Sequence, residues 1–139
     1  MRIGKNNPFN IRYSLRNQWL GLDKDFPFTK GFCNFIDKSY GIRCACYLLM
    51  RSYRMKGIDS IDAIITCFAP PSENYTDKYI KFVSVNSGIY MPYAKLVSVE
   101  QYSKVLHAMS IFEGNRVSYE DIIQVINRFK IKLYENKRS

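Results

Sequence analysis

The chain has few of the residues that carry metal or thiol chemistry. Its 139 residues include one histidine and four cysteines. The cysteines, at positions 33, 44, 46 and 67, show neither zinc-ligand spacing nor a Cys-x-x-Cys pair, which excludes the common zinc modules and thiol redox motifs. We therefore expect no metal and no cofactor, and we expect the cysteines to pack as small side chains in a protein made in a reducing compartment.

Long hydrophobic runs are also missing. The longest apolar stretches, such as residues 45–50, are far shorter than the roughly 20 residues that cross a bilayer. The first residues, Met-Arg-Ile-Gly-Lys-Asn-Asn-Pro, lack the apolar core of a signal peptide. We expect a protein without a transmembrane segment that is made in the cytoplasm. Action on the cell wall or in the periplasm would then need release or delivery by a virion, a holin or a secretion machine.

Acidic residues are scarce. There are 12 Asp and Glu against 21 Lys and Arg, which gives a formal net charge of +9. Such a charge favours an anionic partner, such as nucleic acid, a membrane surface or a wall polymer, but does not choose among them.

With 47% hydrophobic and 24% charged residues the composition is that of a globular protein, and the length suits one core. We expect one domain over residues 1–139.

The spacing of apolar residues predicts a mostly α fold. Ser60, Ser98 and Ser118 are placed to cap helices, Ser98 together with Gln101 as a capping box. The first 35 residues are rich in turn formers and aromatics, so we expect an irregular region with a short β-hairpin around residues 26–35. Apolar residues recur at helical spacing in the segments 40–57, 61–68, 76–86, 98–113 and 118–129.

A double proline separates two of these segments. Pro70 and Pro71 cannot continue the helix that ends near Phe68, and Asn74 or Thr76 can cap the next one. Glu73 is thereby held at a defined surface point between two helix ends, which is how a cleft rim is built. The alternative is an ordinary loop with a surface glutamate.

A second carboxylate of interest ends the helix predicted at 98–113. Glu113 follows Ile111 and Phe112 directly and precedes Gly114. Apolar surroundings favour a protonated carboxyl group, which is the form that a general acid needs. The residue could equally be an ordinary glutamate at the end of a surface helix.

Aromatic and amide side chains supply the other site-like chemistry. Flat rings and amide groups suit a sugar polymer, whose ring faces are apolar and whose edges carry hydroxyl and acetamido groups. The same set suits base stacking on single-stranded nucleic acid, and Trp19 could instead be a core aromatic. The candidates for binding are Asn7, Asn10, Trp19, Tyr75, Thr76 and Tyr79.

Several segments, in this order, resemble a known family. Residues 5–12 read Lys-Asn-Asn-Pro-Phe-Asn-Ile-Arg, residues 18–21 read Gln-Trp-Leu-Gly and residues 40–44 read Tyr-Gly-Ile-Arg-Cys. Residues 69–76 read Ala-Pro-Pro-Ser-Glu-Asn-Tyr-Thr. Together they resemble the peptidoglycan hydrolases of phages and prophages that open with an Asn-Asn-Asn-Pro-Gly-Asn-Ile-Arg segment, and the resemblance covers most of the chain.

The same segments are similar, in permuted order, to those of soluble lytic transglycosylases. This resemblance implies a compact lysozyme-like domain that cleaves the β-1,4 bond between N-acetylmuramic acid and N-acetylglucosamine, as a lytic transglycosylase or a muramidase. It implies Glu113 as the catalytic acid, because the catalytic helix would fall last. If water attacks, Glu73 is the first candidate for the second carboxylate, with Asp23 and Asp25 behind it.

The implied partner is a peptidoglycan glycan strand, bound by a monomer and without nucleic acid. Three departures from the family pattern support an alternative, in which the chain is a catalytically inactive relative. Phe9 replaces a Gly, Ser39 replaces a Glu, and Gly114-Asn115 inverts an Asn-Gly pair. That alternative is a wall-binding or structural protein of a virion or secretion apparatus. A basic helical module that binds nucleic acid is the other alternative, and it would use the cationic C-terminal region.

Overall fold

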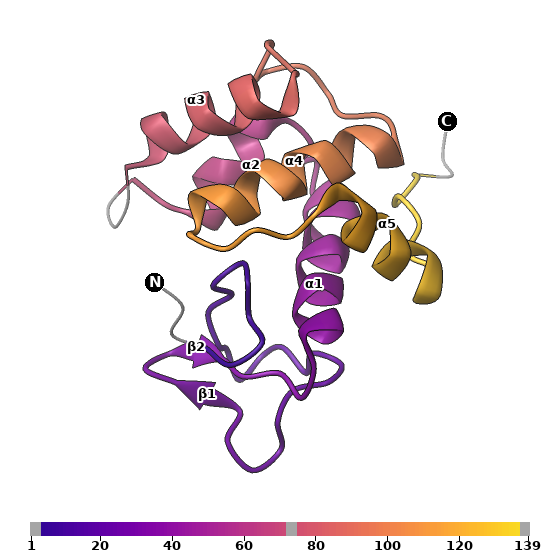
Figure 1. Cartoon of the computed structure of the whole chain (residues 1–139). Helices are drawn as coiled ribbons and strands as arrows, with labels where there is room; N and C mark the ends of the chain where they lie inside the picture. The colour runs from indigo at the N-terminus through magenta and orange to yellow at the C-terminus, as the bar shows by residue number, and fades with distance from the viewer. Residues whose placement is uncertain (1–3, 72–74, 137–139) are drawn as a thin grey trace.

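The computed structural model describes residues 4–71 and 75–136 and confirms the mostly α fold, with five α-helices and one hairpin in that part of the chain. The helices α2, α3 and α4 gather at one end, α1 runs away from them, and the hairpin and N-terminal loops lie at the other end (Figure 1). The elements are β1 Phe28–Thr29, β2 Phe32–Cys33, α1 Lys38–Tyr47, the π-helix η1 Leu48–Tyr53, α2 Ile61–Phe68, α3 Thr76–Ser87, α4 Val99–Phe112 and α5 Tyr119–Arg128.

Serine caps begin three of the helices, as predicted. The hydroxyl oxygens of Ser60, Ser98 and Ser118 accept backbone N–H bonds at 3.2, 3.1 and 3.0 Å, each from the residue three positions later. The capping box predicted with Gln101 is not formed as predicted, since the Gln101 side-chain oxygen accepts from the backbone N–H of Val97 at 2.7 Å and not from that of the cap residue Ser98. The three serine bonds satisfy amide groups that have no partner inside the first helical turn.

The predicted cap of α3 by Thr76 is wrong. The N-cap is Tyr75, which makes no side-chain capping bond, and the alternative cap Asn74 lies outside the described residues. The hydroxyl of Thr76 donates instead to the carbonyl of Ala69 at 2.5 Å. Thr76 therefore ties the start of α3 to the end of α2.

The helix predicted from residue 40 starts earlier and changes its winding. Asp37 caps α1, because its carboxylate accepts from the backbone N–H of Ser39 at 3.0 Å and from the Ser39 hydroxyl at 2.6 Å. At Leu48 the α-helix passes into the π-helix η1. Such a widened turn often occurs at functional sites, and apolar spacing alone does not reveal it.

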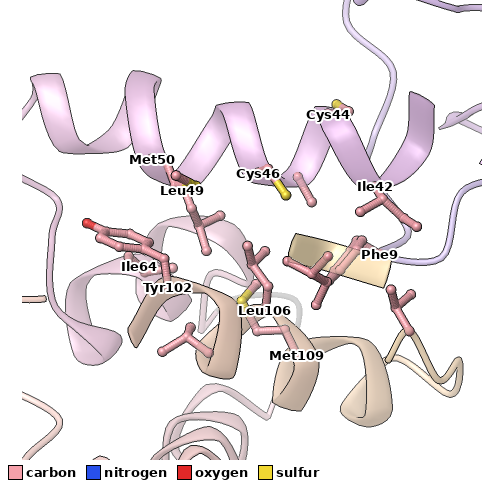
Figure 2. Close-up of a cluster of buried hydrophobic side chains, with 14 of the residues drawn as sticks. Phe9, Ile42, Cys44, Cys46, Leu49, Met50, Ile64, Tyr102, Leu106 and Met109 are labelled. Carbon is pink, nitrogen blue, oxygen red and sulfur yellow. The ribbon is translucent and has the colours of Figure 1, made fainter. Parts of the chain in front are cut away.

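The core lies between the α1–η1 helix and α4. Ile42 and Leu49 from the first face Leu106 and Met109 from the second, with Phe9 at one end of the cluster (Figure 2). Three cysteines pack in this interior as predicted, whereas Cys67 is exposed. Burial raises the pKa of the Cys33 thiol to about 11 and that of Cys46 to about 12, so both stay protonated at neutral pH.

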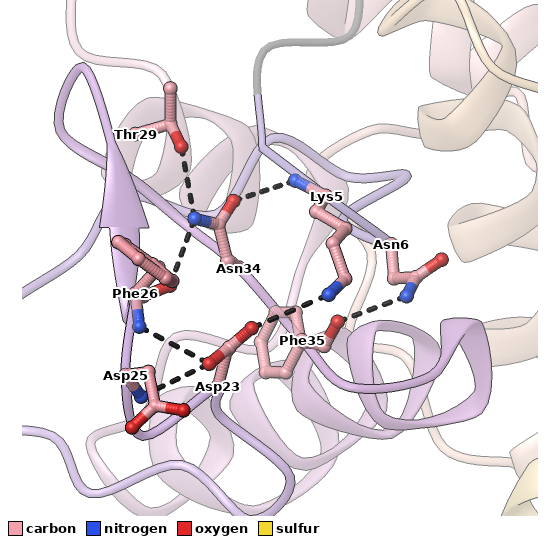
Figure 3. Close-up of polar contacts among 8 residues, drawn as sticks. All are labelled: Lys5, Asn6, Asp23, Asp25, Phe26, Thr29, Asn34 and Phe35. Atoms are coloured by element: carbon pink, nitrogen blue, oxygen red, sulfur yellow. Dashed lines mark hydrogen bonds and ion pairs between the residues drawn. The ribbon is translucent and has the colours of Figure 1, made fainter.

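The N-terminal region is held by side-chain bonds to the backbone. The Asn34 amide donates to the carbonyl of Phe26 and to the Thr29 hydroxyl, each at 2.9 Å, and its oxygen accepts from the backbone N–H of Lys5 at 2.7 Å (Figure 3). Asp23 accepts from the backbone N–H of Phe26 at 3.1 Å. This irregular region is therefore ordered by amide and carboxylate side chains.

Gly41 lets α1 pack directly on the loop at residues 6–8. A Cβ atom at this position would lie 2.1 Å from the carbonyl oxygen of Asn6 and 3.0 Å from Cδ of Pro8. The glycine of one family-like segment thus contacts the asparagine and proline of another.

In the described part of the chain, no helix combines the length and the hydrophobicity that a membrane span requires.

Candidate active site

A cleft of about 670 Å³ opens between the N-terminal region and the helices. Asn10 and Trp19 line it from the N-terminal region, Tyr53 from η1, Phe68 from α2, and Glu113 from the end of α4. Sequence-distant segments therefore meet at one concave surface. Two of these segments, around Asn10 and Trp19, are ones that resemble the phage hydrolases, and a third, at residues 69–76, contributes Ala69 and Pro70 to the lining.

Glu113 is fixed at the cleft wall by its own helix and by the N-terminal loop. Its backbone N–H bonds to the carbonyl of Met109 at 3.0 Å, and Gly114 follows in the left-handed region at φ 86°. The Asn10 amide donates to the Glu113 carboxylate at 2.9 Å and also contacts the Glu113 carbonyl at 3.3 Å. One side chain thus holds both the carboxylate and the helix end.

Asn10 is positioned by the turn that precedes it. Its φ of 53° is left-handed, a conformation that asparagine tolerates better than most residues, and its N–H bonds to the carbonyl of Asn7 at 3.2 Å. A second tie joins this loop to the end of α4, since the Asn115 amide donates to the carbonyl of Pro8 at 3.0 Å. The amide oxygen of Asn10 is buried and has no hydrogen-bond partner within residues 4–71 and 75–136.

Tyr79 lies behind Glu113. Its ring stacks on Phe112, with centroids 3.9 Å apart and planes at 20°, and the residue is 2% exposed. Its buried hydroxyl interacts with the Glu113 side chain. Burial, and next the negative charge of Glu113, raise the pKa of Tyr79 well above its usual range. A neutral phenol therefore lies close to the carboxylate.

Aromatic side chains form much of the cleft wall. Trp19 is half-buried and meets Tyr47 edge to face at a centroid distance of 6.3 Å. The guanidinium of Arg12 lies 5.0 Å from the ring centroid of Phe32, which also lines the cleft. Burial raises the pKa of Tyr53, so its hydroxyl is neutral. Such a wall offers flat apolar surfaces with polar edges.

Other residues predicted for binding lie away from this cleft. Asn7 is fully buried, where its amide donates to the carbonyls of Ile11 at 2.9 Å and Cys33 at 3.1 Å and its oxygen accepts from the Ile11 N–H at 2.9 Å. It shapes the loop that carries Asn10. Thr76 is buried at the junction of α2 and α3, and Tyr75 is 79% exposed beside a separate shallow depression.

Asp23 and Asp25, the later candidates for a second carboxylate, do not line the cleft. Glu73 lies outside the described residues. Asp23 bonds to Lys5 at 3.3 Å and to the backbone of its own loop, with Asp25 beside it, and backbone N–H donation by Phe26 lowers the pKa of Asp23 (Figure 3). Among the described residues that line the cleft, Glu113 is the one carboxylate.

Sequence reasoning missed several residues of the cleft. Arg12 belongs to the same family-like segment as Asn10, so that segment could have indicated it. Phe32 lines the cleft because the hairpin pairs Phe32 with Thr29 and an isolated bridge joins Phe32 to Arg12. Nothing in the sequence singled out Tyr53, Lys56 or Phe68, because the π-helix and the end of α2 bring them to the cleft.

Comparison with known proteins identifies a phage relative. No protein-family model matches the chain. Protein P5 of Pseudoalteromonas phage PM2 is 35% identical over 125 residues, which cover 86% of this chain and 76% of P5. This relationship supports the expected phage origin. The chain therefore belongs to the same protein family as protein P5 of phage PM2.

Proposed function

We propose that the protein cleaves the β-1,4 bond between N-acetylmuramic acid and N-acetylglucosamine in peptidoglycan, with Glu113 as the general acid. The observation that carries this proposal is the position of Glu113 in the 670 Å³ cleft, where Asn10 holds its carboxylate at 2.9 Å. The aromatic wall supports a sugar polymer as the ligand. The resemblance to lytic transglycosylases, in which a glutamate ends the catalytic helix, supports the choice of Glu113.

Glu113 would donate its proton to the glycosidic oxygen as the bond from that oxygen to C1 of the muramic acid breaks. The Asn10 amide would keep the carboxyl group turned toward the cleft. The phenol of Tyr79, neutral and close to Glu113, would face the carboxylate that forms after proton transfer. Positive charge would develop on the sugar ring, next to aromatic surfaces.

Attack on the sugar ring by either of two nucleophiles, its own C6 hydroxyl or water, would give different products. If the C6 hydroxyl of the muramic acid attacks C1, the hydroxyl proton passes to the Glu113 carboxylate and a 1,6-anhydro sugar forms. If water attacks, the product has a reducing end, and a second carboxylate is needed as base or nucleophile. Glu73 remains the first candidate for that role. The single described carboxylate suffices for the first route.

A phage protein with this activity would open the host cell wall during infection or release, as an endolysin or a virion-associated enzyme. The net charge of +9 suits an anionic wall. The mostly α architecture with a small hairpin is compatible with the lysozyme-like domain that the resemblance implies.

Mass spectrometry of the muropeptides released from purified sacculi tests the proposal. Wild-type protein should release soluble products, and Glu113→Gln should reduce the rate by about a hundredfold or more, because general acid catalysis is lost. Glu100→Gln is the matched control, since Glu100 is an exposed glutamate at the start of α4 that pairs with Lys104 at 2.9 Å. Its activity should equal that of the wild type.

The products also distinguish the two routes. Anhydro-muropeptides identify a lytic transglycosylase, and reducing-end muropeptides identify a muramidase and direct attention to Glu73. If wild type releases nothing while both it and Glu113→Gln bind sacculi, the protein is a wall-binding protein and the proposal is wrong. Equal activity of Glu113→Gln and wild type would also contradict it.

A further inference from the structure

Two cations line the same cleft as Glu113. Arg12 lines it from the N-terminal region and Lys56 from the turn after η1. Neither forms an ion pair with a carboxylate in the described part of the chain, where Lys5, Arg54, Lys95 and Lys104 do. Apart from Glu113, the charges on the described wall of the cleft are therefore positive.

The position of Arg12 is well defined although its side chain is exposed. The preceding residue, Ile11, is held by Asn7 through both its N–H and its carbonyl, each at 2.9 Å. Arg12 itself bridges to Phe32 in an antiparallel pair, and its guanidinium lies 5.0 Å from the centre of that ring. The turn that directs Asn10 to Glu113 thus also places a guanidinium at the cleft.

Lys56 is placed by the end of the π-helix. Its backbone N–H bonds to the carbonyl of Tyr53 at 2.9 Å, and Gly57 ends the segment with an N–H bond to the carbonyl of Arg54 at 3.0 Å. Tyr53 and Lys56 therefore reach the cleft from the same turn. The two cations belong to different segments, so a ligand in the cleft meets positive charge from both.

A glycan of N-acetylglucosamine units alone has no charge that could use these cations. N-acetylmuramic acid differs from it by a lactyl ether whose carboxylate is free or is joined to a peptide that carries its own carboxylates. We infer that Arg12 and Lys56 are specificity-determining residues that bind carboxylates of the muramyl glycan, so that the cleft prefers an acidic glycan to a neutral chitin-type one. This inference rests on the proposed function and names the feature of the substrate that the site recognises.

Binding of defined tetrasaccharides to the Glu113→Gln protein, measured by calorimetry, separates the sources of the carboxylate. One ligand is chitotetraose, which is neutral. The second alternates N-acetylglucosamine and N-acetylmuramic acid with free lactyl carboxylates. The third carries peptides, which convert the lactyl carboxylates to amides and add carboxylates further out. Preference for the second ligand identifies the lactyl group, and preference for the third identifies the peptide.

Arg12→Gln and Lys56→Gln should each weaken binding of the preferred acidic ligand by about fivefold and leave chitotetraose unchanged. The preference should also shrink as salt is raised, because both cations are exposed. Arg16→Gln and Lys24→Gln are the controls, since they remove equivalent exposed cations outside the cleft. If Arg12→Gln unfolds, Lys56→Gln carries the test.

Equal affinity for neutral and acidic glycans would overturn this inference while leaving the proposed function intact. An equal loss of all three ligands on removal of either cation would overturn it too. If no glycan binds, and a short single-stranded DNA binds in a way that depends on Arg12 and Lys56, both this inference and the proposed function fail.

Discussion

Two asparagines of one loop have different tasks, and their burial separates them. Asn7 is fully buried and uses its amide and its oxygen on the backbone of Ile11 and Cys33. Asn10 is only half-buried and donates to Glu113. The sequence predicted both as binding residues, because an asparagine that holds a loop and an asparagine that faces a ligand are the same residue type. Their roles cannot be separated from the sequence. Only tertiary contacts distinguish them.

Asn10→Gly tests whether the amide positions Glu113, the proposed acid. Glycine removes the side chain without strain, since it readily adopts the φ of 53° found here, whereas alanine would not. We expect kcat for muropeptide release to fall about tenfold, the approximate effect of losing one hydrogen bond to a charged group. KM should change little, because the lost contact is to Glu113 and not to the glycan.

The control is Asn86→Gly, which removes an exposed amide that donates to the carbonyl of Phe82 in its own helix, α3. Thermal unfolding of both variants checks the fold, and the pH profile of kcat reports on the acid. An Asn10→Gly protein with an unchanged rate and an unchanged pH profile would show that the acid needs no such support.

At the scale of the elements, packing of α1 on the N-terminal loop depends on one missing side chain. A Cβ at Gly41 would lie 2.1 Å from the Asn6 carbonyl oxygen, a backbone atom that cannot move aside easily. Gly41→Ala should therefore lower the free energy of unfolding by about 3 kcal/mol, measured by urea denaturation. Lys38→Ala, an exposed change in the first turn of the same helix, should alter it by less than about 0.5 kcal/mol.

A loss below about 0.5 kcal/mol for Gly41→Ala would mean that the helix and the loop shift apart without cost. The same shift would move Asn10 relative to Glu113. A folded Gly41→Ala protein should consequently also lose part of its activity, which links this element contact to the cleft.

The elements were predictable where local chemistry defines them. Ser60, Ser98 and Ser118 cap their helices because a hydroxyl group three residues before an unpaired N–H gives a local bond. The π-helix and the cap at Asp37 were missed. The apolar residues at 42, 46, 49 and 53 have ordinary α-helical spacing, so the sequence pattern gave no sign of the π-helix at Leu48–Tyr53.

The site was predictable only in part, for a related reason. Motif segments indicated Asn10, Trp19 and Glu113, and the structure brings all three to one cleft. Lys56 and Phe68 carry no motif, and they reach the cleft through the winding of η1 and the end of α2. The motifs therefore predicted some residues that line the cleft, but not the shape of the surface around them.

At the scale of the whole molecule, the C-terminal segment braces the helix that carries one wall of the cleft. After α5 the chain crosses η1, where Ile131 is buried and the Tyr134 N–H bonds to the carbonyl of Met50 at 2.9 Å. Arg54, just after η1, donates to the carbonyls of Leu96 at 2.6 Å and Tyr134 at 2.8 Å. One guanidinium thus joins three distant parts of the chain.

Arg54→Met measures how far the fold depends on this junction. The side chain of Arg54 is 7% exposed, so methionine would fill much of its volume but leave two carbonyl groups without their donor. We expect a loss of about 3 kcal/mol in the free energy of unfolding and faster amide hydrogen exchange at Tyr134. Lys104→Met is the control, because the exposed Lys104 pairs with Glu100 of its own helix and loss of that pair should cost less than about 1 kcal/mol. Equal losses for the two variants, or unchanged exchange at Tyr134, would show that Arg54 does not secure the C-terminal segment to η1.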